Sequence, residues 1–181
     1  MTIRSLVLGA TSVALLSTTS AFAADLIIPT TPQPIYESAG FSWDGFYAGG
    51  QFGGQFYPGL TYGLVGVHAG INFIVADPIL LGVEGTAEYI FGSGGNFGEF
   101  FVNARLGAVV TDSVLIYGLA GTGVEVNSVG TTFGTYQLGG GVEFAVTDSV
   151  SVRGQLVGVG FYNDPDFFDG VKATVGISYH F

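Results

Sequence analysis

Apolar and polar residues alternate strictly over the last eleven residues, VKATVGISYHF. Every second position is apolar: Val171, Ala173, Val175, Ile177, Tyr179 and Phe181. The intervening positions, from Lys172 to His180, are polar residues or glycine. Because successive side chains of a β-strand point to opposite faces, this segment is predicted to form a strand with one apolar and one polar face.

Similar alternating segments recur between residues that favour turns. Asp77, Asp112 and Asp148 each lie in a short turn sequence, at intervals of 35 and 36 residues. Asp, Pro and Ser favour tight turns, so this interval corresponds to one hairpin plus its connection. We predict tight turns at one end of the strands and longer loops, 92–96, 127–131 and 163–170, at the other. The predicted strands are 43–56, 60–75, 79–91, 98–110, 114–125, 133–146, 150–162 and 170–181.

Counting from each turn aspartate gives the same two faces in every repeat. The apolar face includes Val65, Val67, Phe73, Leu81, Val83, Phe100, Val102, Leu106, Leu138, Val142 and Phe144. The opposite face carries His68, Asn72, Glu84, Glu88, Glu99, Asn103, Arg105, Gln137, Glu143, Arg153, Gln155, Lys172 and Thr174. Segment 114–125 is apolar on both faces, and only the register of the repeat predicts that Tyr117 and Glu125 face inward.

The composition indicates that these strands lie in a membrane. Apolar residues make up 48% of the chain and charged residues only 10%, against about 25% charged in an ordinary soluble domain. Beyond the N-terminal segment, no apolar run approaches the roughly 18 residues of a transmembrane helix. An even number of alternating strands therefore predicts an all-β fold, an eight-stranded antiparallel transmembrane β-barrel, in which the last strand pairs with the first.

Charge patterning predicts the contents of the barrel. The chain has a formal net charge of −10, which excludes the basic footprint of a nucleic-acid-binding protein. Eight strands enclose a space about wide enough for side chains to fill, and ions buried there need partners. We predict a mostly closed lumen in which carboxylates pair with cations, without specifying the individual pairs. The candidates are Glu84, Glu88, Glu99, Glu143, Arg105, Arg153 and Lys172.

Aromatic residues on the apolar face predict two girdles at the membrane interfaces. Those towards the loop ends are Tyr62, Tyr89, Phe91, Phe100, Tyr136 and Tyr162. Those towards the turn ends are Phe73, Phe144, Tyr179 and Phe181, with Trp43 at the start of the first strand.

The N-terminal residues predict export from the cytoplasm. A positively charged start, a short apolar stretch and Ala21-Phe22-Ala23 together are typical of a secretory signal peptide, residues 1–23. Residues 24–40 contain three prolines, which block ladder hydrogen bonds, so we expect an extended periplasmic leader before the barrel, residues 41–181. The chain has no cysteine, so neither disulfides nor thiolate metal sites are available.

Five segments resemble the small alphaproteobacterial outer-membrane β-barrel family, which includes porin-family proteins, surface antigens and OmpA/OmpX-like barrels. They are 43–50, 81–85, 103–107, 139–143 and 176–181. The resemblance implies a Gram-negative outer-membrane protein with periplasmic termini, surrounded by lipid and lipopolysaccharide. It also implies periplasmic chaperones and the barrel assembly machinery as partners, with Ile177, Tyr179 and Phe181 matching the assembly signal of a last strand.

Few residues suggest other chemistry. His68 is a possible heme or metal ligand, but a lone histidine in a polar lumen is more often a hydrogen-bonded filler. Glu84 and Glu88 lie roughly 13 Å apart along one strand, too far for the carboxylate pair of a glycosidase. His180 has no metal-ligand spacing around it. We therefore expect no metal and no cofactor at these positions.

Two further combinations are formally possible. Ser178, His68 and Glu143 provide the residue types of an esterase triad, although no histidine lies near a predicted outer loop. The acidic loop 163–169 offers carboxylates to Ca²⁺ but lacks the full spacing of an EF-hand. We expect no catalytic residues, and predict a structural role in envelope integrity and surface presentation. The alternatives are a narrow porin-like channel or a heme-binding or adhesion surface protein.

Overall fold

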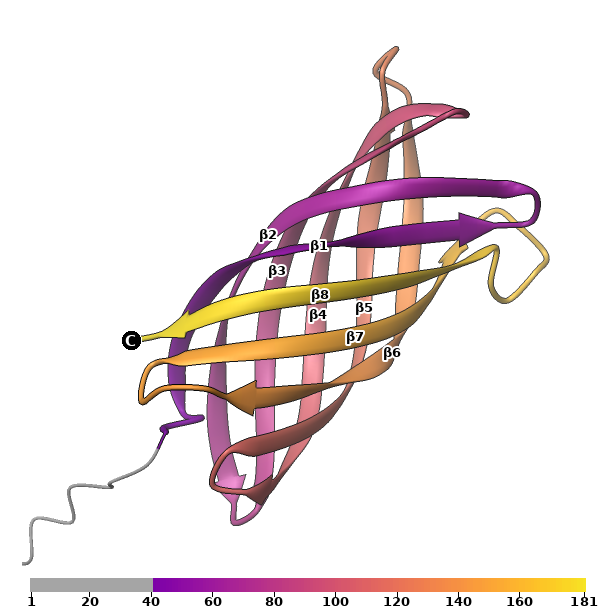
Figure 1. Cartoon of the computed structure of the whole chain (residues 1–181). Helices are drawn as coiled ribbons and strands as arrows, with labels where there is room; N and C mark the ends of the chain where they lie inside the picture. Colours follow the sequence, from indigo (N-terminus) through magenta and orange to yellow (C-terminus); the bar gives the residue numbers. More distant parts are fainter. Residues whose placement is uncertain (1–40) are drawn as a thin grey trace, which may run out of the picture. The chain divides into compact units, whose positions relative to one another are not determined.

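A computed structural model of the chain describes residues 41–181; the predicted signal peptide 1–23 and leader 24–40 lie outside the described residues. The strands are β1 (Gly45–Tyr57), β2 (Leu60–Ala76), β3 (Ile79–Gly92), β4 (Gly95–Thr111), β5 (Val114–Asn127), β6 (Thr132–Ala145), β7 (Val150–Phe161) and β8 (Gly170–His180). Each pairs antiparallel with its neighbours in the chain, and β8 pairs with β1 to close the barrel (Figure 1). The predicted fold class is confirmed.

The predicted strand boundaries agree with the structure to within three residues. The largest difference is at β4, which begins at Gly95 rather than 98. As a result, the connection predicted as a longer loop at 92–96 is a two-residue turn, Ser93-Gly94. We call the end with the β2–β3, β4–β5 and β6–β7 connections the turn end, and the opposite end the loop end. The loops predicted at 127–131 and 163–170 correspond to the connections 128–131 and 162–169, so only the loop predicted at 92–96 was wrong.

Glycines bring β1 close to β8 at the closure of the barrel. A Cβ atom added to Gly49 or Gly53 would lie 2.0 Å from the carbonyl oxygen of Ile177 or Ala173. Real Cβ atoms never approach a carbonyl this closely, so only glycine permits this strand spacing. Gly49 and Gly53 therefore allow the close approach of β1 to β8 that closes the barrel.

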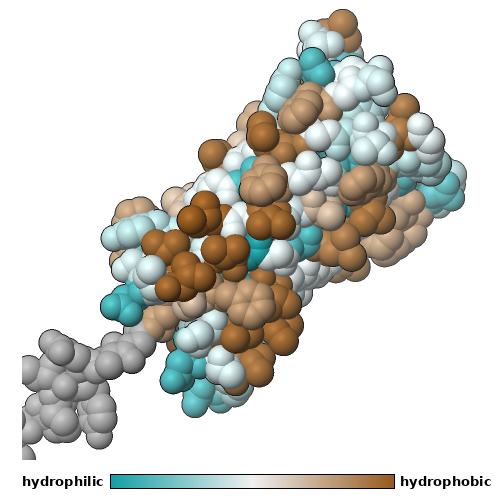
Figure 2. All heavy atoms as spheres, in the orientation of Figure 1, coloured by the Kyte–Doolittle hydropathy of each residue, from teal (hydrophilic) through white to brown (hydrophobic). Residues whose placement is uncertain are grey.

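The outer wall carries an apolar belt. Residues such as Val67, Val102 and Leu156 are about 60% exposed, and Figure 2 shows apolar side chains over the middle of the wall with hydrophilic residues towards its ends. Two predicted girdle residues point inward instead. Trp43 is 3% exposed because the chain before β1 turns into the barrel mouth, and Tyr62 is 7% exposed because it shares the inward face of His68.

Within residues 41–181, no helix is long and apolar enough to span a bilayer.

Candidate functional site

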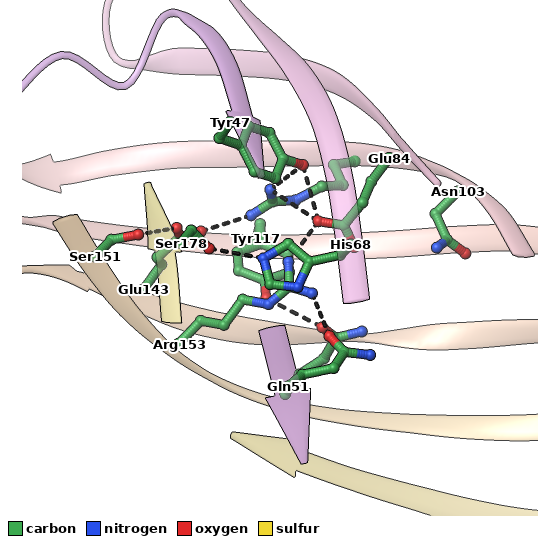
Figure 3. Close-up of polar contacts among 12 residues, drawn as sticks. Tyr47, Gln51, His68, Glu84, Asn103, Tyr117, Glu143, Ser151, Arg153 and Ser178 are labelled. Atoms are coloured by element: carbon green, nitrogen blue, oxygen red, sulfur yellow. Dashed lines mark hydrogen bonds and ion pairs between the residues drawn. The ribbon is translucent and has the colours of Figure 1, made fainter. Parts of the chain in front are cut away.

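An ion-paired cluster, the inner cluster, occupies the half of the lumen nearer the turn end. It consists of Glu84, Arg105, Glu143 and Arg153, all with side chains at most 1% exposed. Arg105 contacts Glu143 Oε2 through Nη2 at 2.9 Å and Glu84 Oε2 through Nη1 at 3.4 Å. Arg153 Nη1 donates to the same Glu84 oxygen from the opposite side of the barrel (Figure 3). Each carboxylate of this cluster therefore has a guanidinium partner.

Aromatic side chains hold the Arg105 guanidinium in place. Arg105 Nη1 donates to the Tyr47 hydroxyl at 2.5 Å, and that hydroxyl donates to Glu84 Oε2 at 2.9 Å. The guanidinium carbon lies 4.0 Å from the ring centroid of Tyr117, a cation–π distance. Tyr117 is buried in the lumen, as the repeat register predicted, whereas Glu125 lies further along the same face and is half-buried.

A second ion-paired cluster, the outer cluster, lies nearer the loop end and consists of Glu88, Glu99 and Lys172. Lys172 Nζ donates to Glu88 Oε2 and lies 2.5 Å from Glu99 Oε2. Glu88 and Glu99 are direct cross-strand partners, as are Glu99 and Glu125, so carboxylates face each other across three adjacent strands. Like charges in that arrangement repel, and Lys172 reaches across the lumen from β8 to offset the repulsion.

Gln51 joins the two clusters. Its amide donates to Glu88 Oε1 and accepts from Arg153 Nη2 at 2.5 Å. Gln55 extends the chain of contacts from Glu99 to the Tyr57 hydroxyl at the loop end, with distances of 2.8 and 2.7 Å. The structure thus brings all seven predicted ion-pair candidates into two linked clusters.

An apolar cluster fills the part of the lumen beside the ion pairs. It contains Leu115 and Leu119 of β5, Val157 and Val159 of β7, and Phe101 of β4, each at most 2% exposed. The sequence analysis did not identify this cluster as a lumen feature. The one sequence feature that points to this cluster is that segment 114–125 is apolar on both faces. One face contacts lipid, and the other contacts the apolar cluster.

Aromatic rings occupy the lumen at the turn end; we call Phe41, Trp43, Tyr47 and His180 the aromatic stopper. The Phe41 ring lies 4.5 Å from the rings of both Trp43 and His180, and Tyr47 stacks on His180 at 5.4 Å. Trp43 Nε1 donates to the carbonyl of Asp112 in the β4–β5 turn at 3.2 Å. These contacts attach the chain that precedes β1 to the inside of the barrel.

The possible esterase triad is not assembled. His68 Nε2 lies 2.8 Å from Ser178 Oγ, but Glu143 contacts Arg105 and Ser151 rather than His68. Ser178 and His68 are at most 2% exposed, which leaves no access for a substrate. His180 lies 3.2 Å from Ser151 Oγ and 3.4 Å from Glu143 Oε1.

Among residues 41–181, no three His, Asp or Glu side chains are placed to hold a metal ion. In the acidic loop, Asp164 Oδ1 accepts from the backbone N–H of Asp166, and Asp169 Oδ2 accepts from that of Phe161. These carboxylates therefore stabilise the loop backbone.

The residues that match the assembly signal lie on the outer wall. Ile177 and Tyr179 of β8 and Phe181 after it are exposed, and the backbone N–H of Phe181 donates to the Phe46 carbonyl at 3.0 Å. Their recognition by an assembly machinery stays a prediction.

Comparison with known proteins shows the fold. No family model matches the sequence, and neither does any curated protein. The N-terminal β-barrel domain of Pseudomonas aeruginosa OprF is similar, with 14% identity over 76% of this chain and 98% of that one, at a TM-score of 0.53. Ail, the attachment invasion locus protein of Yersinia pestis, has 15% identity over 76% of this chain and 99% of that one, at 0.51.

These similarities identify the fold as that of small outer-membrane β-barrels, and the exposed apolar belt is what such a barrel presents to lipid. The predicted location in the outer membrane agrees with both observations. The resemblance to the alphaproteobacterial family still rests on the sequence alone.

Proposed function

We propose that this protein is a structural component of the outer membrane that supports envelope integrity and presents short connections at the cell surface. Its lumen is closed to solutes. The observation that carries this proposal is the continuous chain of ion pairs and hydrogen bonds from the aromatic stopper to Gln55, packed beside the apolar cluster.

The energetics of buried charge support a closed lumen. Each charged side chain in the two clusters has lost its water, and its desolvation is offset only by its partners. A solute passing through would have to separate pairs such as Arg153–Glu84 and Lys172–Glu99, leaving uncompensated charges in a low-dielectric space. The apolar cluster offers no polar group that would compensate.

Single-channel recording in planar bilayers tests this proposal. We expect no steady openings from the purified, folded protein at any applied voltage. Steady, large openings of the unchanged protein would refute the closed lumen. A protein that has been boiled before reconstitution serves as the control, because brief irregular currents seen in both samples come from defects in the bilayer.

A narrow channel is the second candidate, because the polar contacts run along the whole lumen. It predicts small, steady conductance steps whose size changes when Lys172 is replaced by Met. Identical recordings from the two proteins, both without steps, would exclude it.

The surface chemistry does not favour binding of polyanions or heme. Every Lys and Arg within residues 41–181 is buried in the lumen, and the long outer connection carries only acidic charges, Asp164, Asp166 and Asp169. An adhesion site for sulfated or phosphorylated glycans needs exposed cations. His68 is buried, so titration with hemin is expected to leave the Soret band unchanged.

The proposed partners follow from the outer wall. The apolar belt would contact the acyl chains of outer-membrane lipid and lipopolysaccharide. Periplasmic chaperones and the barrel assembly machinery would act before insertion, with Ile177, Tyr179 and Phe181 of the β8 region as the recognised face. No surface of the described chain is suited to nucleic acid, because none carries an exposed cation.

A further inference from the structure

The longest loop-end connection, residues 162–169, folds against the outer wall of the barrel. A Cβ atom added to Gly158 would lie 2.6 Å from the ring of Phe168. A Cβ added to Gly160 would lie 2.6 Å from the Tyr136 ring and 2.8 Å from the Phe167 carbonyl oxygen. Phe168 therefore occupies the space that a side chain at Gly158 would fill.

That space belongs to the lipid-facing wall. Gly158 lies on the same face of β7 as the exposed residue Leu156. Its cross-strand partners are Leu138 on β6 and Val171 on β8, and both are exposed. The loop thus supplies an apolar side chain to a row of the belt in which β7 itself has only glycine.

Several contacts hold the loop in this position. The Tyr136 hydroxyl donates to the Phe167 carbonyl oxygen, and the Asp169 backbone N–H donates to the Val159 carbonyl at 2.9 Å. The ring centroids of Phe167 and Phe168 lie 4.6 Å apart, and that of Tyr136 lies 6.0 and 6.4 Å from them. Phe167, Phe168 and Asp169 are therefore held against β6 and β7, rather than free above the mouth.

We propose that this loop is a membrane anchor, with Phe167 and Phe168 inserted at the boundary between the headgroups and acyl chains of the outer leaflet. The two rings are 66% and 40% exposed, and the Phe168 ring fills the gap that Gly158 leaves in the apolar belt. Aromatic side chains favour this boundary, and burial in lipid removes apolar area that water would otherwise cover. The inference rests on the proposed membrane location of the barrel.

The anchor changes which outer segment is available at the surface. A loop that lies in the lipid interface is shielded from soluble partners, although it is the longest loop-end connection. The tip of the β5–β6 hairpin, residues 128–131, is then the longest accessible segment of the loop end, and its Val129 is 82% exposed. Recognition of the protein by a soluble partner would use this tip.

Tryptophan fluorescence in vesicles of brominated phosphatidylcholine tests the anchor. Phe168→Trp is compared with Val129→Trp as the water-exposed control and Leu156→Trp as the belt control. The signal of the unchanged chain, whose single tryptophan Trp43 is buried in the lumen, is subtracted. We expect Phe168→Trp to be quenched at least threefold more than Val129→Trp, most strongly by bromines near the headgroup.

Quenching of Phe168→Trp no greater than that of Val129→Trp, with Leu156→Trp quenched, would overturn the anchor and leave the membrane barrel intact. Absence of quenching at Leu156→Trp would overturn the proposed location itself. If Phe168→Trp does not fold, judged by heat-modifiable gel migration, Phe167→Trp decides by the same criterion, because its ring is more exposed.

Discussion

Along β3, β4 and β8 the lumen is lined by charged residues such as Glu84, Glu99 and Lys172, whereas along β5 and the outer half of β7 it is lined by Leu119, Val157 and similar residues. Both sides are buried to the same extent. On the charged side each group depends on a specific partner, because an unpaired buried charge is costly. On the apolar side stabilisation comes from contact area and is lost gradually. One small barrel therefore shows two ways of filling an interior.

The largest expected effect comes from removing one cation of the charged side. Lys172→Met leaves Glu88 and Glu99 facing each other without a cation, and we expect the free energy of unfolding to fall by about 3–5 kcal/mol. Urea unfolding in lipid vesicles, followed by fluorescence, measures this change. The triple variant Lys172→Met/Glu88→Gln/Glu99→Gln should recover most of the stability, because the outer cluster then carries no charge. If Lys172→Met were as stable as the unchanged protein, Glu88 and Glu99 would not depend on the cation of Lys172.

Truncation on the apolar side is expected to have a somewhat smaller effect. Leu119→Ala leaves a cavity beside Val157 and should lower the unfolding free energy by about 2–5 kcal/mol. The same urea titration measures it, with Leu119→Met as the volume-conserving control. Stability on the apolar side should depend on the volume that the side chain fills, which Leu119→Met nearly conserves. If Leu119→Met were as destabilising as Leu119→Ala, the apolar side would not differ from the charged side in this respect.

A charged substitution on the outer wall measures the free-energy cost of placing a cation in lipid. Val67→Arg places a cation on the exposed belt and should cost about 2–4 kcal/mol if Val67 lies near the bilayer midplane. Folding yield and unfolding in lipid vesicles measure it, and Val67→Leu is the matched apolar control. Unchanged folding of Val67→Arg would mean that this face does not contact lipid.

The smallest effect on stability, but a clear effect on assembly, is expected at Phe181. Phe181→Ala removes the last aromatic residue of the proposed recognition face and should slow insertion in cells, leaving urea unfolding of the refolded protein nearly unchanged. Pulse-labelling followed by heat-modifiable gel migration measures the rate. Phe73→Ala, at another exposed aromatic position of the turn end, should insert normally. Equal rates for the two variants would reject the assembly signal.

Much of the fold was predictable because its determinants are local. A two-residue period specifies which side chains share a face, and turn aspartates at nearly equal spacing locate the hairpins. The strand ends were less certain: nothing in Gly95-Asn96-Phe97 shows that β4 begins before residue 98. Trp43 was assigned to the lipid face as the first residue of the predicted strand 43–56, but β1 begins at Gly45, and alternation does not determine the direction of a residue before the strand.

By itself, the sequence determined the strand number, the two faces and the set of charges that enter the lumen, since each depends only on alternation and nearby turns. The tertiary structure alone decided the partners. Glu143 and Arg153 are cross-strand neighbours, yet Glu143 pairs with Arg105 and Arg153 pairs with Glu84 on the opposite wall. It also decided that Phe168 covers Gly158. Such contacts depend on how the closed sheet curves, which brings together residues that no local pattern relates.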